Sequence, residues 1–284
     1  MSSDGEHSFD VLVVGGGLAG MSAACKLAES GLRVHIVEQA TTLGGAVLRR
    51  AQTGQNPNLN GVHESSWRDL MARFDRVRKL MSVSVCSTYT GTDSTGAIVV
   101  TNTSTSTSVS LRPKAIIVAT GALEKVRPRM GWHLPGVMTA GALQVLLKTS
   151  LRAPKKRVLL AGSGPLLLAV AAQLTRLGNP PLAVIEEARP SRKFWHALKL
   201  PVGYLLEAAN YIKVLKVAGV PIYEGRFIAR IAHCTSGLRV SFTGDDKLCF
   251  DTDFLALHDG IAKNCYGMRP VGMPIWHEAG DCAL

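Results

Sequence analysis

The sequence has no pair of cysteines at the spacing of a metal or dithiol motif. Its six cysteines are widely scattered over 284 residues, and none belongs to a CxxC pair. Zinc ribbons, cysteine-ligated iron–sulfur clusters and redox-active dithiols depend on such pairs. We therefore expect reduced, mostly buried thiols and no metal site.

The sequence also lacks an uninterrupted apolar segment long enough to cross a bilayer. The apolar stretch at 11–28 contains several glycines and follows the acidic residues Asp4, Glu6 and Asp10. A signal peptide begins with basic residues instead, and a membrane span needs about 20 apolar residues. We expect a cytoplasmic protein without a membrane span.

Acidic residues are few relative to basic ones. Lys and Arg number 32 against 21 Asp and Glu, which gives a net charge of +11. Between positions 112 and 157, ten basic residues stand against one acid, Glu124. Such a stretch indicates a solvated face, an acidic partner or an anionic ligand. No nucleic-acid-binding motif accompanies it, so we expect no nucleic-acid partner.

Apolar residues and glycine are what the sequence has in quantity. Hydrophobic residues make up 46% and charged residues 19%, which is typical of a globular protein. The length corresponds to about two domains of roughly 150 residues each. The 28 glycines exceed the usual share, which indicates many turns or close backbone contacts.

A glycine-rich turn lies between a short β-branched run and an Ala-rich segment near the N-terminus. Residues 9–14 predict a strand, 21–30 a helix and 33–38 a second strand, and the turn between the first two has the spacing GxGxxG. Glu38 ends the second strand, twenty-three residues after Gly15. This order and spacing predict a βαβ unit that binds a dinucleotide, although the glycines of a βαβ unit can also serve the turn alone.

Each residue of this motif has an expected role. Gly15 permits the tight turn, Gly17 lets a pyrophosphate approach the backbone, and Gly20 lets the helix pack close to the strand, while Glu38 accepts from a ribose hydroxyl. The candidate binding residues are Gly15, Gly16, Gly17, Leu18, Ala19, Gly20, Glu38, Gln39, Gly44, Gly45 and Arg49.

The same pattern occurs a second time. A predicted strand at 155–161 leads into a turn containing Gly162 and Gly164, followed by a helix and by a strand that ends at Glu186. Leu167 replaces the third glycine, so we expect the helix to stand further from the strand. A carboxylate at Glu186 favours NAD over NADP. The alternative is a Rossmann-like domain that is architectural and turns over no nicotinamide.

Two further strand ends complete the expected first site. The predicted strand 115–118 ends at Thr120 and Gly121, and the chain ends near Gly280 and Asp281, whose carboxylate suits a ribityl or ribose hydroxyl. We expect residues 251–257 to re-enter the first sheet. The predicted fold class is therefore α/β, with two Rossmann-like dinucleotide-binding domains, the second inserted into the first. The first comprises 1–125 and 250–284, and the second, NAD-binding-like, comprises 126–249.

These motifs together resemble the flavoproteins with two dinucleotide-binding domains, relatives of the glutathione and thioredoxin reductases. The segments Ala119–Ala122 (ATGA), Gly131–Gln144 (GWHLPGVMTAGALQ) and Gly162–Leu166 (GSGPL) look like one subfamily. It comprises the FAD-containing α-type subunits of opine oxidases, hydroxyproline and proline dehydrogenases and the hydrogen cyanide synthase. The resemblance implies FAD, with NAD or another adenine nucleotide in the second domain. It also implies a catalytic β-type flavoprotein subunit as partner and a small amine or amino-acid substrate.

The sequence departs from that subfamily near its C-terminus. The relatives run well beyond this length, many with a cysteine-rich segment for a [2Fe–2S] cluster, and the segment from His258 to Asp281 is short by comparison. We expect either a partner subunit to complete the flavin site or this chain to be a cofactor-poor version of the fold.

No residue is assigned a catalytic role from the sequence. His35 lies in a predicted strand and His63 in a predicted loop, and His133, His258 and His277 stand without a carboxylate or serine at a recognisable spacing. We expect all five histidines to be structural. The leading interpretation is a FAD-dependent oxidoreductase subunit that oxidises an amino-acid or opine C–N bond with its partner. The alternatives are an independent NADH-dependent flavin reductase and a nucleotide-binding scaffold subunit without catalysis of its own.

Overall fold

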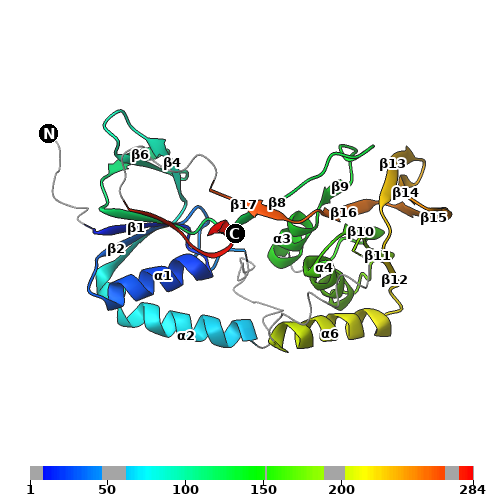
Figure 1. The fold of residues 1–284 in the computed structure, drawn as a ribbon, viewed down its shortest axis with the longest axis horizontal. Helices are drawn as coiled ribbons and strands as arrows, with labels where there is room; N and C mark the ends of the chain where they lie inside the picture. The colour runs from blue at the N-terminus through cyan, green and yellow to red at the C-terminus, as the bar shows by residue number, and fades with distance from the viewer. Residues whose placement is uncertain (1–8, 47–61, 151, 189–201, 266–274, 284) are drawn as a thin grey trace. The chain divides into compact units, whose positions relative to one another are not determined.

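The computed structural model describes residues 9–46, 62–150, 152–188, 202–265 and 275–283 (Figure 1). These residues form two compact units. The first unit contains the described residues up to 123 and those from 262 onward, and the second contains 124–261. The chain leaves the first unit through β8 (Ala122–Glu124) and returns through β17 (Ile261–Lys263), and these two strands pair with each other. The expected fold, with one Rossmann-like unit inserted into another, is confirmed.

The first unit is built on a five-stranded parallel sheet in the order β18-β7-β1-β2-β3. Its strands are β1 (Val11–Val14), β2 (Val34–Val37), β3 (Met81–Ser84), β7 (Ala115–Val118) and β18 (Trp276–Glu278). One face packs against α1 (Leu18–Glu29) and α2 (Val62–Arg76), and the other against the antiparallel strands β4 (Ser87–Thr92), β5 (Ile98–Asn102) and β6 (Thr107–Leu111) (Figure 1). Two short 3-10 helices complete the unit, η1 (Arg78–Leu80) and η2 (Gly280–Ala283).

The second unit repeats this arrangement, with the parallel strand order β12-β11-β10-β16-β9. The strands are β9 (Val137–Thr139), β10 (Val158–Gly162), β11 (Ala183–Glu186), β12 (Ile222–Glu224) and β16 (Phe254–His258). Helices α3 (Ala140–Ser150), α4 (Pro165–Arg176) and α6 (Val202–Val217) cover one face. An antiparallel sheet of β13 (Ile228–Cys234), β14 (Gly237–Phe242) and β15 (Asp245–Thr252) covers the other.

The central strands are short apolar runs because both of their faces are covered. Every residue of β1, β2, β10 and β11 is buried, which is the burial expected of parallel strands between two layers. Leu167, which takes the place of the third glycine in the second turn, is fully buried in the core beneath α4. The side chain therefore contributes to packing where the first unit has a glycine.

One expectation about the sheets is wrong. Residues 251–257 were expected to re-enter the first sheet, but β16 pairs with β10 and β9 in the second sheet. The first sheet is instead completed by β18, which pairs with β7. Residues 250–261, which we expected in the first domain, lie in the second unit of the structure.

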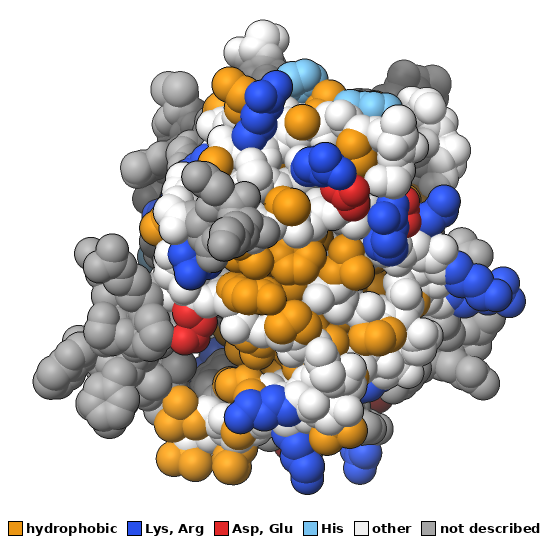
Figure 2. All heavy atoms as spheres, turned by 90° about the vertical axis from the view of Figure 1, so that its right-hand side faces the viewer, with side chains coloured by type: hydrophobic (Ala, Val, Ile, Leu, Met, Phe, Trp, Pro, Cys, Tyr) orange, Lys and Arg blue, Asp and Glu red, His pale blue; other side chains and the backbone are white. Residues whose placement is uncertain are grey.

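Part of the surface is apolar. Figure 2 shows hydrophobic side chains gathered in the middle of one face, with Lys and Arg side chains toward its margins. Helix α6 contributes Val202, Leu206 and Val217 to the exposed hydrophobic residues of the protein, with exposed fractions of 70%, 67% and 83%. In the part of the chain that the structure describes, no helix is long and apolar enough to cross a membrane.

Candidate functional site

The first glycine-rich turn lies where the chain order of the first sheet reverses. From β1 the chain passes through α1 to β2 on one side, whereas β7 lies on the other side of β1. Ligands of open α/β sheets bind at such a switch point, beyond the carboxyl ends of the strands. Gly15 and Ala119 meet there, because a Cβ on Gly15 would lie 2.3 Å from the Ala119 carbonyl oxygen.

The three glycines of this motif differ in whether the surrounding structure requires a glycine at that position. A Cβ on Gly20 would lie 1.9 Å from the Gly15 carbonyl oxygen, so close packing of α1 on β1 requires Gly20, as expected. Gly17 has a φ of −74°, which any residue adopts. A Cβ there would meet only the Gly45 Cα, at an ordinary 3.8 Å. Packing therefore explains Gly15 and Gly20 but leaves Gly17 unexplained.

Gly17 lies at the beginning of α1. Gly17 is the N-cap of this helix, and no side chain caps it. The first amides of a helix attract anions, so this end suits a phosphate. Gly280 packs against the same turn, since a Cβ on it would lie 2.6 Å from the Ala19 Cβ. The fold therefore brings the Gly280-Asp281 pair to the first glycine turn.

Glu38 and the Gly44-Gly45 pair close around the same turn. The Glu38 carboxylate accepts from the amides of Gly16 at 2.6 Å and Ala40 at 2.8 Å, and the side chain is buried. A carboxylate has about four acceptor positions, so two remain for a ribose hydroxyl. The Gly44 amide donates to the Gly16 carbonyl oxygen at 2.8 Å. Gln39 is exposed, and Arg49 lies outside the described residues.

Thr120 and Gly121 are held by Asn264, a residue that no sequence motif singles out. The Thr120 hydroxyl donates to the carbonyl oxygen of Asn264 at 2.5 Å, and the Asn264 amide side chain donates back to the Thr120 carbonyl oxygen at 3.2 Å. These residues are 144 positions apart, so no local sequence pattern predicts the contact. Asn264 thereby fixes the strand end beside the first turn.

The second turn has a similar geometry in the second unit. A Cβ on Gly162 would lie 2.0 Å from the His258 carbonyl oxygen, and Gly164 has a φ of +116°, which favours glycine. Gly164 is the N-cap of α4, again with no side-chain cap. The Glu186 carboxylate accepts from the amides of Gly164 at 3.3 Å and Ala188 at 3.1 Å. The three expected residues, Gly162, Gly164 and Glu186, therefore lie at one switch point.

His258 has a carboxylate partner that the sequence did not reveal. Its Nδ1 lies 2.9 Å from the Glu124 Oε1, although the two residues are 134 positions apart. Burial opposes ionisation of Glu124, but hydrogen bonds from His258, Thr139 and the Gly141 amide outweigh it and lower the pKa of the carboxyl. The expectation that His258 stands without a carboxylate is therefore wrong. The signal available in the sequence was its position at the end of a buried apolar strand.

The basic stretch serves more than one purpose. Arg129 pairs with the buried carboxylate of Asp259 through Nη2, and the Arg127 amide donates to the same carboxylate at 2.8 Å. Both arginines also lie within 4 Å of Glu187, whose pKa is nevertheless raised by burial. Another part of the stretch, Arg152 and 155–157, lines a hollow of about 820 Å³ near Asp253.

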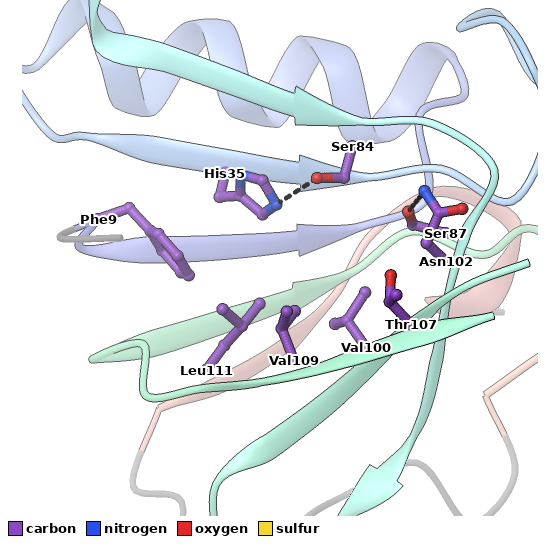
Figure 3. Close-up of a pocket in the computed structure, with 9 residues that line it drawn as sticks. All are labelled: Phe9, His35, Ser84, Ser87, Val100, Asn102, Thr107, Val109 and Leu111. Atoms are coloured by element: carbon purple, nitrogen blue, oxygen red, sulfur yellow. Dashed lines mark hydrogen bonds between the residues drawn. The ribbon is translucent and has the colours of Figure 1, made fainter. Parts of the chain in front are cut away.

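A smaller cavity, of about 210 Å³, lies in the first unit between the parallel sheet and strands β4 to β6 (Figure 3). The His35 ring faces it, with Nδ1 2.6 Å from the Ser82 hydroxyl and Nε2 3.1 Å from the Ser84 hydroxyl. Phe9 stacks on the ring at a centroid distance of 5.1 Å. No described acid, lysine or arginine lines this cavity. It therefore does not suit a phosphate, and the contacts agree with the structural role expected of His35.

Comparison with known proteins gives concordant matches. The family model described as Pyridine nucleotide-disulphide oxidoreductase matches residues 9–280. An opine oxidase subunit of Rhizobium meliloti (strain 1021) is 28% identical over 96% of this chain and 61% of its own length. Hydrogen cyanide synthase subunit HcnB of Pseudomonas aeruginosa is 32% identical over 75% of this chain and 47% of its own length. A thioredoxin reductase of T. acidophilum superposes with a TM-score of 0.63 at 16% identity, covering 96% of this chain and 90% of that one.

The match to the family model extends over nearly the whole chain, whereas the chain spans only about half the length of the curated relatives it matches. All six cysteines are free thiols, and none belongs to a CxxC pair. The expected resemblance to the opine oxidase and hydrogen cyanide synthase subunits is confirmed. The chain therefore belongs to the pyridine nucleotide-disulphide oxidoreductase family, the class of FAD- and NAD(P)-binding oxidoreductases that its sequence predicts.

Proposed function

We propose that this chain is the FAD-binding subunit of an oxidoreductase that oxidises an amino-acid or opine C–N bond together with a β-type flavoprotein subunit. The observation that carries the FAD assignment is that neither the backbone conformation nor the packing of the described residues requires a glycine at position 17. A glycine that neither φ nor packing requires, at the start of an uncapped helix, is explained by a ligand that approaches its backbone. The six free thiols suit the cytoplasm, where we place the protein.

The residues around this turn fit the parts of FAD. The backbone from Gly15 to Gly20 and the first turn of α1 would hold the pyrophosphate, and the two remaining acceptor positions of Glu38 would hold the adenosine ribose. Gly45 packs against Gly17, because a Cβ on Gly45 would lie 2.9 Å from the Gly17 Cα, and Gly44 and Gly45 belong to the same proposed set. Further sites that we propose at the flavin are Thr120, Gly121 and Asp281, with Asp281 accepting from a ribityl hydroxyl. Leu18, Ala19, Gln39 and Arg49 belong to the same proposed set.

Bound FAD would accept and release two electrons, so the polypeptide need not supply a catalytic acid or base. In our proposal the substrate carbon next to the amine nitrogen loses a hydride to the flavin of the partner subunit, and the nitrogen loses a proton, which leaves an imine. This chain would then pass the two electrons onward. The opine oxidase and hydrogen cyanide synthase relatives are named as subunits. This supports the proposal that the present chain also acts within a heteromeric enzyme.

A second candidate function rests on the second glycine turn. Gly162, Gly164 and Glu186 lie together at the N-cap of α4, and the geometry suits an adenine nucleotide such as NAD. A chain that held both FAD and NADH would be an independent NADH-dependent flavin reductase. A scaffold subunit would hold the nucleotides without turnover of its own.

Anaerobic reduction of the flavin separates these functions. The chain loaded with FAD is mixed with L-proline or an opine, alone and with the β-type subunit of a related opine oxidase, and the visible flavin absorbance is followed. The partner alone with the amine gives the bleaching of its own flavin. We expect the mixture to lose, in addition, the absorbance of the FAD bound to this chain, and we expect no bleaching by the amine or by NADH with the isolated chain. Bleaching by NADH alone would favour the reductase, and no bleaching of this chain's FAD under any condition would favour the scaffold.

A further inference from the structure

The two switch points of the chain can be compared residue by residue, because both units have the same strand order. The first glycine of each turn packs against the backbone across the switch, Gly15 against Ala119 and Gly162 against His258. The next two residues are Thr120 and Gly121 in the first unit and Asp259 and Gly260 in the second. The second unit therefore places an imidazole where the first unit has only a methyl group.

The His258 side chain is only 7% exposed, and its orientation is fixed. The lowered pKa of Glu124 keeps that carboxyl ionised, and a carboxylate only accepts hydrogen bonds, so Nδ1 of His258 carries the donated proton. The other nitrogen, Nε2, lies 3.7 Å from the position of a Cβ on Gly164. Among the described residues, the imidazole forms no other hydrogen bond. Its second nitrogen is thus aimed at the N-cap of α4.

The other charged groups at this edge already have partners. Asp259 is held by Arg129 and by the Arg127 amide, and Glu187 lies within ion-pair distance of both arginines. Glu186 accepts from two backbone amides. Arg129 Nη1 forms no hydrogen bond with a described residue but lies 3.8 Å from the Glu187 Oε1, so it remains directed at a carboxylate. His258 is therefore a group beside the second turn that can offer a donor to an anion without leaving an acidic partner.

We propose that His258, positioned by Glu124, binds the diphosphate of an adenine nucleotide at the second glycine turn as the imidazolium, with Nδ1 donating to Glu124 and Nε2 donating to a phosphate oxygen. Glu124 is the positioning residue, since it fixes the ring orientation through Nδ1. The helix amides alone attract any anion, whereas the imidazole adds a directed, charge-assisted bond. This proposal rests on a nucleotide at the second turn but not on FAD in the first unit.

The test is calorimetric titration of the full chain with ADP and, separately, with adenosine, which lacks the phosphates. Both titrations are carried out in the Gly17→Val background, so that ADP cannot occupy the first turn. We expect His258→Asn to weaken ADP binding about tenfold or more. Asparagine keeps a donor near the place of Nδ1 for Glu124 but has no atom at the place of Nε2. His258→Gln, which has a donor near the place of Nε2, should recover part of the loss.

Two further measurements separate a binding role from a structural one. Adenosine affinity should be unchanged in His258→Asn, because only the phosphate contact is lost, and Glu124→Gln should lower ADP affinity while His258 remains. The exposed His233 of β13 provides the control, as His233→Asn should bind both ligands like the parent. Unchanged ADP affinity in His258→Asn, equal losses for ADP and adenosine, or no ADP binding by the parent would each overturn the proposal. Failure of the wild-type chain to bind FAD would instead count against the proposed function alone.

Discussion

Gly17→Val is expected to abolish FAD binding while leaving the fold intact. Gly17 has a backbone conformation open to any residue, and a Cβ there would make only an ordinary contact with Gly45. A valine side chain would instead fill the place where the pyrophosphate meets the first amides of α1. Losing charge-assisted hydrogen bonds of about 1.5 to 3 kcal/mol each would weaken FAD binding by about a hundredfold or more.

The measurement is FAD affinity by fluorescence titration of the apoprotein, with thermal unfolding as the check on folding. Gly203→Val is the control, because Gly203 of α6 is exposed and no described residue lies within 4 Å of an added Cβ. We expect the control to bind FAD like the wild type. If Gly17→Val retains wild-type FAD affinity, the first glycine turn is not the FAD-binding site.

Gly20→Ala is expected to destabilise the protein strongly, even in the absence of a ligand. The added Cβ would lie 1.9 Å from the Gly15 carbonyl oxygen. The backbone fixes the positions of both atoms, so no side-chain rotation can relieve the clash. Helix α1 would have to move off β1, on which it buries Met21 and Ala24. Overpacking of this kind costs about 3 kcal/mol or more, against less than about 1 kcal/mol gained from the higher helix propensity of alanine.

Urea unfolding of the apoproteins measures this effect directly. Gly17→Ala serves as the comparison three residues away, where an added Cβ makes only an ordinary 3.8 Å contact with the Gly45 Cα, and its unfolding midpoint should stay close to that of the wild type. Equal midpoints for Gly20→Ala and Gly17→Ala would mean that close helix packing is not what requires Gly20.

The sequence predicted those parts of the fold that depend on local pattern. The order of strand, glycine-rich turn, helix, strand and acid located both βαβ units, because each feature lies within about thirty residues of the next. The distinction between Gly17 and Gly20 could also be stated in advance from the motif. It took the structure to establish that packing requires one of them and not the other.

Other features depend on which distant segments meet, and the sequence does not encode that locally. The apolar strand Phe254–His258 suits the centre of either parallel sheet, so its pattern could not decide between β10 and β7 as a neighbour. The true partner of β7, Trp276–Glu278, is three residues long and not fully buried. The His258–Glu124 pair spans 134 positions and has no local signature.

The visible absorption spectrum of the purified chain, with identification of any nucleotide released on heating, tests the central claim most directly. Stoichiometric FAD, taken up during expression or on reconstitution, is the result that this account predicts. The same experiment on Gly17→Val should give a colourless, folded protein. A wild-type chain that is folded, colourless and unable to take up added FAD would contradict the assignment of the first glycine turn as a flavin site.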